Sequence, residues 1–144
     1  MSNLFILLVD DETSFIETMA KRLKKREFNV ISATSGEDAL NLMQKNRNLD
    51  VVLLDVKMPG MDGIETLKKM KSEFPLTEVI MLTGHGTIES AIEGMKGGAF
   101  DYLMKPCDID QLVAKVDEAA KKKQEHADRM EKARLEKVMT THGV

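Results

Sequence analysis

The chain has 144 residues, with 21 basic and 24 acidic side chains and a formal net charge of −3. At this length one ordinary domain buries roughly two-thirds of its unfolded surface, so folding does not require a disulfide or a structural metal. The slightly acidic balance gives no general attraction to nucleic acid or anionic lipid, so we expect no direct nucleic acid binding.

The chain has few signs of export or membrane insertion. Its single cysteine, Cys107, cannot form an intramolecular disulfide, which favours a reducing compartment, and the expected location is cytoplasmic. Residues 1–9 have no basic segment before their short apolar run, so we expect no signal peptide. No stretch approaches the about 20 apolar residues that span a bilayer, so we expect no membrane span.

Short apolar runs alternate with segments of helical period along the chain. The runs cover residues 4–9, 29–33, 51–54, 79–82 and 102–104, and such continuous runs are typical of strands buried on both faces. Apolar stripes at helical spacing follow within residues 15–23, 64–74 and 88–95, while Ser35 and Asp108 each resemble the start of a capped helix. The pattern predicts an α/β fold with a doubly wound parallel sheet.

Polar side chains follow four of the five predicted strands. Asp10 and Asp11 follow the first, Asp55 the third, Thr83 the fourth and Lys105 the fifth. The carboxyl ends of parallel strands form the ligand-binding edge of such a sheet, so these side chains are expected to converge there. Three carboxylates close together repel one another unless a cation lies among them, which indicates Lys105 and a Mg²⁺ site.

Each of these residues also has a purely structural explanation. Asp10 and Asp11 are suitable caps for the first helix, Thr83 with Gly84 suits a turn, and Lys105 suits a solvated strand end. The joint pattern favours one site, but periodicity alone does not specify the reaction.

Four segments in order together resemble the receiver domains of two-component response regulators, which are CheY-like. They are LVDDE at 8–12, LDVKMPGMDG at 54–63, MLTG at 81–84 and GAFDYLMKP at 98–106. The resemblance covers about residues 4–119 and implies a flavodoxin-like, five-stranded sheet of order 2-1-3-4-5. Residues 83–102 are most similar to receivers of enhancer-binding transcriptional activators.

The resemblance implies a role for each acidic residue of the site. Asp55 is implied as the nucleophile that attacks a phosphohistidine and becomes an aspartyl phosphate. Asp11, Asp55 and the backbone carbonyl of Lys57 are implied as Mg²⁺ ligands, with Asp10 acting largely through water. Lys105 is implied to pair with the phosphoryl oxygens.

The resemblance also implies a switch and a shaped loop. Thr83 is expected to donate its hydroxyl to the phosphoryl group, and Tyr102 to turn inward as Thr83 moves, which alters the face of the fourth helix and fifth strand. From the residue type alone, the favoured interpretation of Tyr102 is a packing side chain whose hydroxyl finds a partner. Pro59 and Gly63 are expected to shape the loop after Asp55, and the bond before Pro106 to be cis.

The end of the chain differs from the family pattern. We predict a receiver domain over residues 1–119 and a helical extension or linker over 120–144. The extension is rich in helix formers, but its apolar stripe is thin: Ala120, Ala127, Met130, Ala133 and Val138. It is either a solvated, partly frayed continuation of the last helix, or a dimer stalk or linker to an effector domain.

The sequence therefore predicts a phosphoacceptor signalling domain whose only catalysis is its own phosphorylation and slow dephosphorylation. Expected partners are a histidine kinase or phosphotransfer protein, and a downstream protein or effector domain. A hydrolase with an aspartyl nucleophile is less favoured, because Lys57 stands where such enzymes carry a second acid. A flavin or nucleotide binder needs a glycine-rich loop after the first strand, where this chain has Asp10, Asp11 and Glu12. A receiver-like module that is never phosphorylated is a further alternative.

Overall fold

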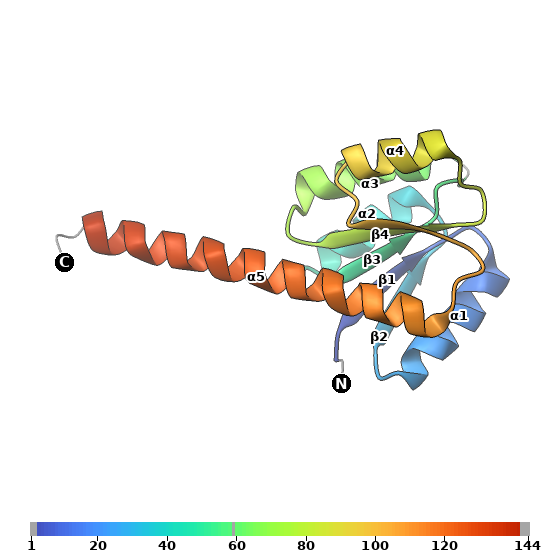
Figure 1. Cartoon of the computed structure of the whole chain (residues 1–144), viewed down its shortest axis with the longest axis horizontal. Helices are drawn as coiled ribbons and strands as arrows, with labels where there is room; N and C mark the ends of the chain where they lie inside the picture. The colour runs from blue at the N-terminus through green and yellow to red at the C-terminus, as the bar shows by residue number, and fades with distance from the viewer. Residues whose placement is uncertain (1–2, 59, 142–144) are drawn as a thin grey trace.

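The computed structural model describes residues 3–58 and 60–141, which form a parallel sheet between two layers of helices (Figure 1). The five strands lie in the order β2-β1-β3-β4-β5 and all pair in parallel, which confirms the predicted α/β fold and strand order. The strands are β1 (Phe5–Val9), β2 (Asn29–Ala33), β3 (Val51–Leu54), β4 (Glu78–Thr83) and β5 (Asp101–Met104), and the helices are α1 (Thr13–Lys25), α2 (Gly36–Lys45), α3 (Gly63–Glu73), α4 (Ile88–Lys96) and α5 (Ile109–Thr141).

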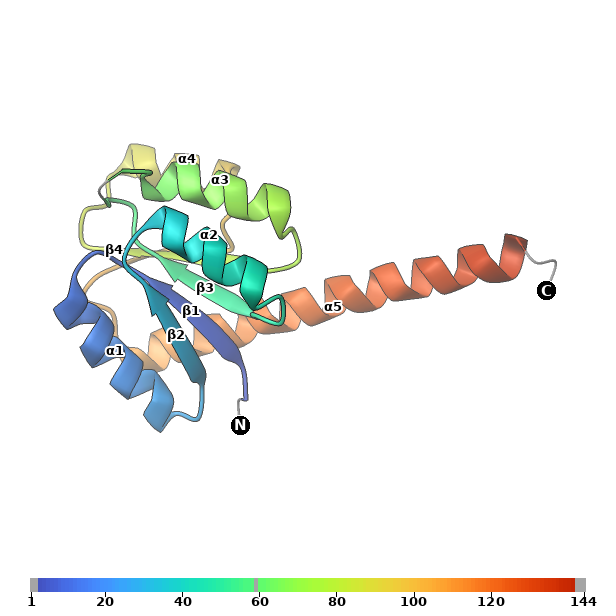
Figure 2. The ribbon, with the colours of Figure 1, turned by 180° about the vertical axis from the view of Figure 1, so that it is seen from behind.

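Successive strand residues point to opposite faces, so each central strand contributes to two cores. Helices α1 and α5 cover one face and α2, α3 and α4 the other, as the reverse view shows (Figure 2). The first core includes Ile6, Leu8, Leu53, Ile80, Leu82, Leu23, Leu112 and Val116, and the second includes Leu7, Val52, Leu54, Met81, Met43, Leu67 and Met70. Two close-packed apolar cores hold the central strands in place and thereby position the residues that follow their carboxyl ends.

Side-chain caps begin three of the helices. Ser35 Oγ accepts the backbone N–H of Asp38 at 3.2 Å, Asp62 caps α3 through Glu65 at 2.9 Å, and Thr87 and Ser90 cap α4 reciprocally. Helix α1 begins after Glu12 without a side-chain cap bond. Neither Asp10 nor Asp11 is the N-cap residue of α1, so the capping interpretation of this acidic pair is wrong.

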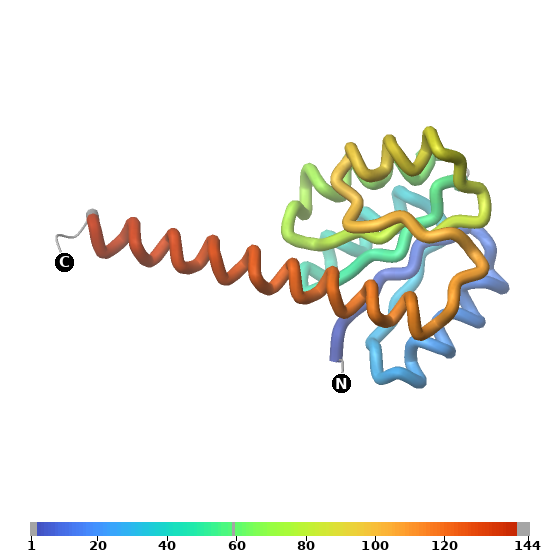
Figure 3. The backbone as a smooth tube through the Cα atoms, in the orientation of Figure 1, coloured from blue at the N-terminus to red at the C-terminus, as the bar shows by residue number. Residues whose placement is uncertain are grey.

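Helix α5 continues without interruption for 33 residues and projects well beyond the sheet, as the backbone trace shows (Figure 3). Two lysines attach it to the amino ends of the strands as it leaves the domain. Lys123 Nζ lies 3.0 Å from Asp50 Oδ1, and Lys122 Nζ lies 3.8 Å from Glu78 Oε2. This confirms an extended C-terminal helix. Throughout residues 3–58 and 60–141, no helix combines the length and apolar character that a membrane span requires.

Candidate functional site

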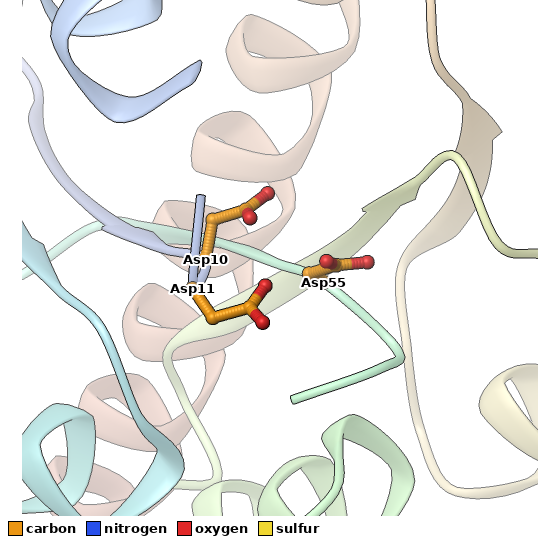
Figure 4. A group of neighbouring side chains, drawn as sticks. All are labelled: Asp10, Asp11 and Asp55. Carbon is orange, nitrogen blue, oxygen red and sulfur yellow. The ribbon is translucent and has the colours of Figure 1, made fainter. Parts of the chain in front are cut away.

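Three carboxylates meet at the carboxyl edge of the sheet (Figure 4). Asp10 and Asp11 follow β1, and Asp55 follows the adjacent β3, whose register pairs Val9 with Leu54. One carboxylate oxygen from each residue lies within 4.8 Å of the other two. Asp10 and Asp55 are buried and Asp11 is exposed, so the cluster opens to solvent on one side.

The hydrogen bonds of the cluster leave one oxygen unused. Asp55 Oδ1 accepts the backbone N–H of Val56 at 2.8 Å, and Asp10 Oδ1 accepts that of Glu12 at 2.9 Å. Asp55 Oδ2 is buried and has no hydrogen-bond partner in the described part of the chain. A buried carboxylate oxygen without a partner is unfavourable, so the donor set fits a hard, oxygen-binding cation such as Mg²⁺.

Lys105, which follows β5, supplies positive charge beside these acids. Its Nζ lies 2.5 Å from Asp10 Oδ2 and 3.4 Å from Glu12 Oε1. Burial raises the pKa of the Asp10 carboxyl even though the hydrogen bond from Lys105 acts in the opposite direction. Burial acts to lower the pKa of Lys105, but the hydrogen bond to Asp10 and the negative charges of Asp10, Asp55 and Glu12 together raise that pKa. The ammonium is therefore firmly cationic.

The two predicted switch residues have other partners in this structure. Thr83 is buried at the end of β4, and its Oγ1 accepts the backbone N–H of His85 at 3.0 Å. A hydroxyl that accepts one bond still has its own hydrogen to donate. The Tyr102 hydroxyl lies 2.6 Å from Ser90 Oγ, which connects β5 to α4. Ser90 is a partner that the sequence did not reveal, because pairing across elements leaves no local signal.

The loops around the cluster are tightly constrained. Gly63 N donates to the Val56 carbonyl oxygen at 2.7 Å, and a Cβ atom on Gly63 would collide with the Asp55 backbone. Glycine is therefore required for this close approach. The peptide bond between Lys105 and Pro106 is cis. Lys57 is exposed beside the site, and Pro59 lies outside the described residues.

An open pocket of about 290 Å³ adjoins the acidic cluster. It is lined by Asp11, Glu12, Lys57, Met58 and His85. A pocket of this size is at the lower end of the range for ligand sites, and it is small for a nucleotide. Glu12 lies in the LVDDE segment at 8–12, but it reaches Lys105 only because the fold brings the ends of β1 and β5 together.

Comparison with known proteins identifies the class. Residues 6–117 match the model of the response regulator receiver domain, so the chain belongs to this family. The transcriptional regulatory protein ZraR of Escherichia coli O157:H7 is 42% identical over 117 residues, which cover 81% of this chain and 26% of ZraR. The chain spans about a quarter of the length of such relatives, several of which are transcriptional regulators.

Solved structures agree with this assignment. A receiver domain protein from Clostridium thermocellum is 35% identical, with a TM-score of 0.80 over 84% of this chain and 97% of that one. In a complex of CheX, CheY, BeF3 and Mg from Borrelia burgdorferi, the matching chain is 29% identical, with a TM-score of 0.74 over 78% of this chain and 86% of that one. Receivers act in phosphorylation-dependent two-component signalling, and bind Mg²⁺ at an acidic pocket.

Proposed function

We propose that Asp55 accepts a phosphoryl group from a histidine kinase or phosphotransfer protein in a Mg²⁺-dependent reaction. One observation supports this above all others: the Asp55 Oδ2 atom is buried beside two further carboxylates, and no described residue donates a hydrogen bond to it. We assign Asp10, Asp11, Asp55 and the Lys57 backbone carbonyl to the metal. When bound, Mg²⁺ would neutralise the acidic cluster and the charge of the incoming phosphoryl group.

The protein's own contribution is to hold the reacting oxygen and the compensating charges in place. Asp55 Oδ1 accepts the backbone N–H of Val56, so Oδ2 is the Asp55 oxygen left for the cluster. In the proposed step, an Asp55 oxygen bonds to phosphorus as the phosphorus–nitrogen bond of phosphohistidine breaks, and that electron pair returns to the imidazole. Lys105 then pairs with the phosphoryl oxygens, and Thr83 donates its hydroxyl to them.

We propose that the output surface is the face formed by α4 and β5. In this switch, Thr83 moves toward the phosphoryl group and Tyr102 leaves Ser90 to turn inward. The expected consequence is altered binding to a downstream protein or effector domain. The apolar side chains available for such contacts include Ile88, Ile92, Met95 and Met104, each at least 48% exposed.

We assign no reaction on a separate substrate to this site. Its catalysis is limited to phosphorylation of Asp55 and slow removal of that group, because Lys57 lies where an acid would protonate a leaving group. The place of action is proposed to be the cytoplasm, where histidine kinases present their phosphohistidine.

We propose that residues 1–119 form the receiver and 120–144 a linker or a dimer stalk. The described part of the extension has exposed Met130, Leu135, Val138 and Met139. If these side chains pair two copies, sedimentation velocity of the whole chain detects a dimer that Leu135→Glu converts to monomer. A wild-type monomer at high micromolar concentration would exclude the stalk and leave the linker.

The phosphorylation proposal is tested by intact mass. The whole chain is incubated with Mg²⁺ and acetyl phosphate, and one phosphoryl group is expected on wild type and none on Asp55→Asn. Asp38→Asn is a matched control, because Asp38 is an exposed acid outside the cluster. Equal modification of wild type and Asp55→Asn would refute the assignment of Asp55.

A further inference from the structure

Lys105 is held on the side of α1 by three groups. Besides Asp10 Oδ2 at 2.5 Å and Glu12 Oε1 at 3.4 Å, its Nζ lies 3.8 Å from the centre of the Phe15 ring. The Lys105 side chain is only 12% exposed, so these contacts are partly desolvated and stronger than on an open surface. All three holding groups follow β1 within six residues, and none is the nucleophile Asp55.

We propose that Glu12 and Phe15 form a resting site for the Lys105 ammonium, and that this resting site opposes phosphorylation of Asp55. The inference rests on the proposed function, in which Lys105 pairs with the phosphoryl oxygens. Asp10 belongs to the proposed metal set, whereas Glu12 and Phe15 belong only to the resting site. They are therefore the positioning residues that retain Lys105 once a metal ion engages Asp10.

The direction of the effect follows from thermodynamic linkage. A contact that exists only in the unphosphorylated arrangement stabilises that arrangement and raises the free energy needed to leave it. Among the described residues, Asp55 Oδ2 has no hydrogen-bond partner while Lys105 pairs with Asp10 and Glu12. In the proposed arrangement the ammonium gives up its contacts with Glu12 and Phe15 to pair with a phosphoryl group on Asp55. Weakening the resting site therefore favours the phosphorylated arrangement.

The experiment measures binding of a phosphoryl analogue rather than turnover. Mg²⁺ and beryllium fluoride are titrated into the whole chain, and bound fluoride is followed by ¹⁹F NMR. Phe15→Leu, which removes the ring but keeps an apolar side chain, is expected to tighten half-saturation about threefold to tenfold. Glu12→Gln is expected to tighten it about twofold, because Glu12 is more exposed.

Two controls separate this effect from a general change in structure. Phe15→Tyr retains an aromatic face and is expected to bind like wild type. Glu17→Gln removes an exposed acid from the same helix and is also expected to leave binding unchanged. A direct readout is the proton NMR chemical shift of the Lys105 Hε atoms. In the metal-free protein, the ring current of Phe15 is expected to move this chemical shift upfield. That shift is expected to disappear on saturation and in Phe15→Leu.

The outcomes distinguish failure of the resting site from failure of the proposed function on which it rests. Weaker or unchanged analogue binding by Phe15→Leu overturns the resting site while the proposed function stands. The absence of an upfield shift at Lys105 in metal-free wild type does the same. A wild-type chain that binds no beryllium fluoride and is not modified by acetyl phosphate refutes the proposed function, and the resting site is refuted with it.

Discussion

The two ends of the sheet differ in how nearby cations compensate the charge of their buried acids. At the amino end, the carboxylate of Glu78 lies 3.6 Å from Lys71 Nζ and 3.8 Å from Lys122 Nζ. At the carboxyl end, Lys105 pairs with Asp10, whereas Asp55 Oδ2 has no hydrogen-bond partner among the described residues. Glu78 Oε1 also has no hydrogen bond within residues 3–58 and 60–141, but the nearby Lys71 compensates its charge.

The difference shows which charges serve folding and which serve a ligand. Asp50 at the amino end is likewise satisfied, since Oδ2 accepts the Phe5 N–H at 2.9 Å and Oδ1 lies 3.0 Å from Lys123. Buried charges that are paired contribute to a specific structure, whereas repelling charges lower stability unless a ligand compensates them. Asp50 directly precedes β3 and Glu78 begins β4, and the carboxyl ends of the same two strands lead to Asp55 and Thr83.

Removing a cation from the amino end is expected to have the largest effect. Lys71→Met leaves Glu78 buried and removes bonds from Lys71 to the carbonyls of Pro75 and Thr77, both 3.0 Å. We expect the free energy of unfolding to fall by about 2–4 kcal/mol in urea denaturation. The exposed Lys68→Met is the control, with a change below about 0.5 kcal/mol.

A second substitution tests the cause of that loss. In Lys71→Met combined with Glu78→Leu, no buried charge is left uncompensated, so part of the stability is expected to return. A double variant as unstable as the sum of the single variants would show that the ion pair is not the reason.

Removing an acid from the carboxyl end is expected to have the opposite sign. In metal-free buffer, Asp55→Asn relieves repulsion with Asp10 and Asp11 and should raise the free energy of unfolding by about 1–2 kcal/mol. The matched control is Asp117→Asn, an exposed acid on α5. Destabilisation by Asp55→Asn would mean that this end is also electrostatically satisfied.

Bound Mg²⁺ is expected to relieve the repulsion among Asp10, Asp11 and Asp55. At a concentration tenfold above its dissociation constant, Mg²⁺ should stabilise wild type by about 1.4 kcal/mol. The gain should be smaller in Asp55→Asn, because one of the assigned ligands has lost its charge. Thermal unfolding with and without EDTA measures the stabilisation by Mg²⁺ in each protein. Equal stabilisation of wild type and Asp55→Asn would contradict the assigned ligand set.

The smallest effect is expected where α5 leaves the domain. Lys123→Met removes the pair with Asp50 and a 3.1 Å bond to the Leu49 carbonyl, but Asp50 keeps its bond to Phe5. We expect a loss of about 0.5–1 kcal/mol and faster amide exchange near residue 123. Lys121→Met, from the exposed side of the same turn, serves as control. A change as large as that of Lys71→Met would remove the distinction between partly exposed and buried pairs.

Local patterns predicted most of the fold and the acidic cluster. Continuous apolar runs predicted the strands to within one or two residues, and the convergence of Asp10, Asp11 and Asp55 followed from the parallel order. The caps were harder, because the acidic pair after β1 suited a helix start equally well by residue type. Only the folded geometry directs the Asp10 carboxylate to Glu12 and Lys105 instead.

What the sequence determined by itself is the alternation of strands and helices, the polar residues after the strands and the helical end of the chain. These depend on residue type and on neighbours a few positions away. The tertiary structure alone decided that Lys105 contacts Phe15, that Tyr102 meets Ser90 and that Lys122 reaches Glu78. Such contacts join segments tens of positions apart or on different elements, and their distances are fixed only when the two cores pack.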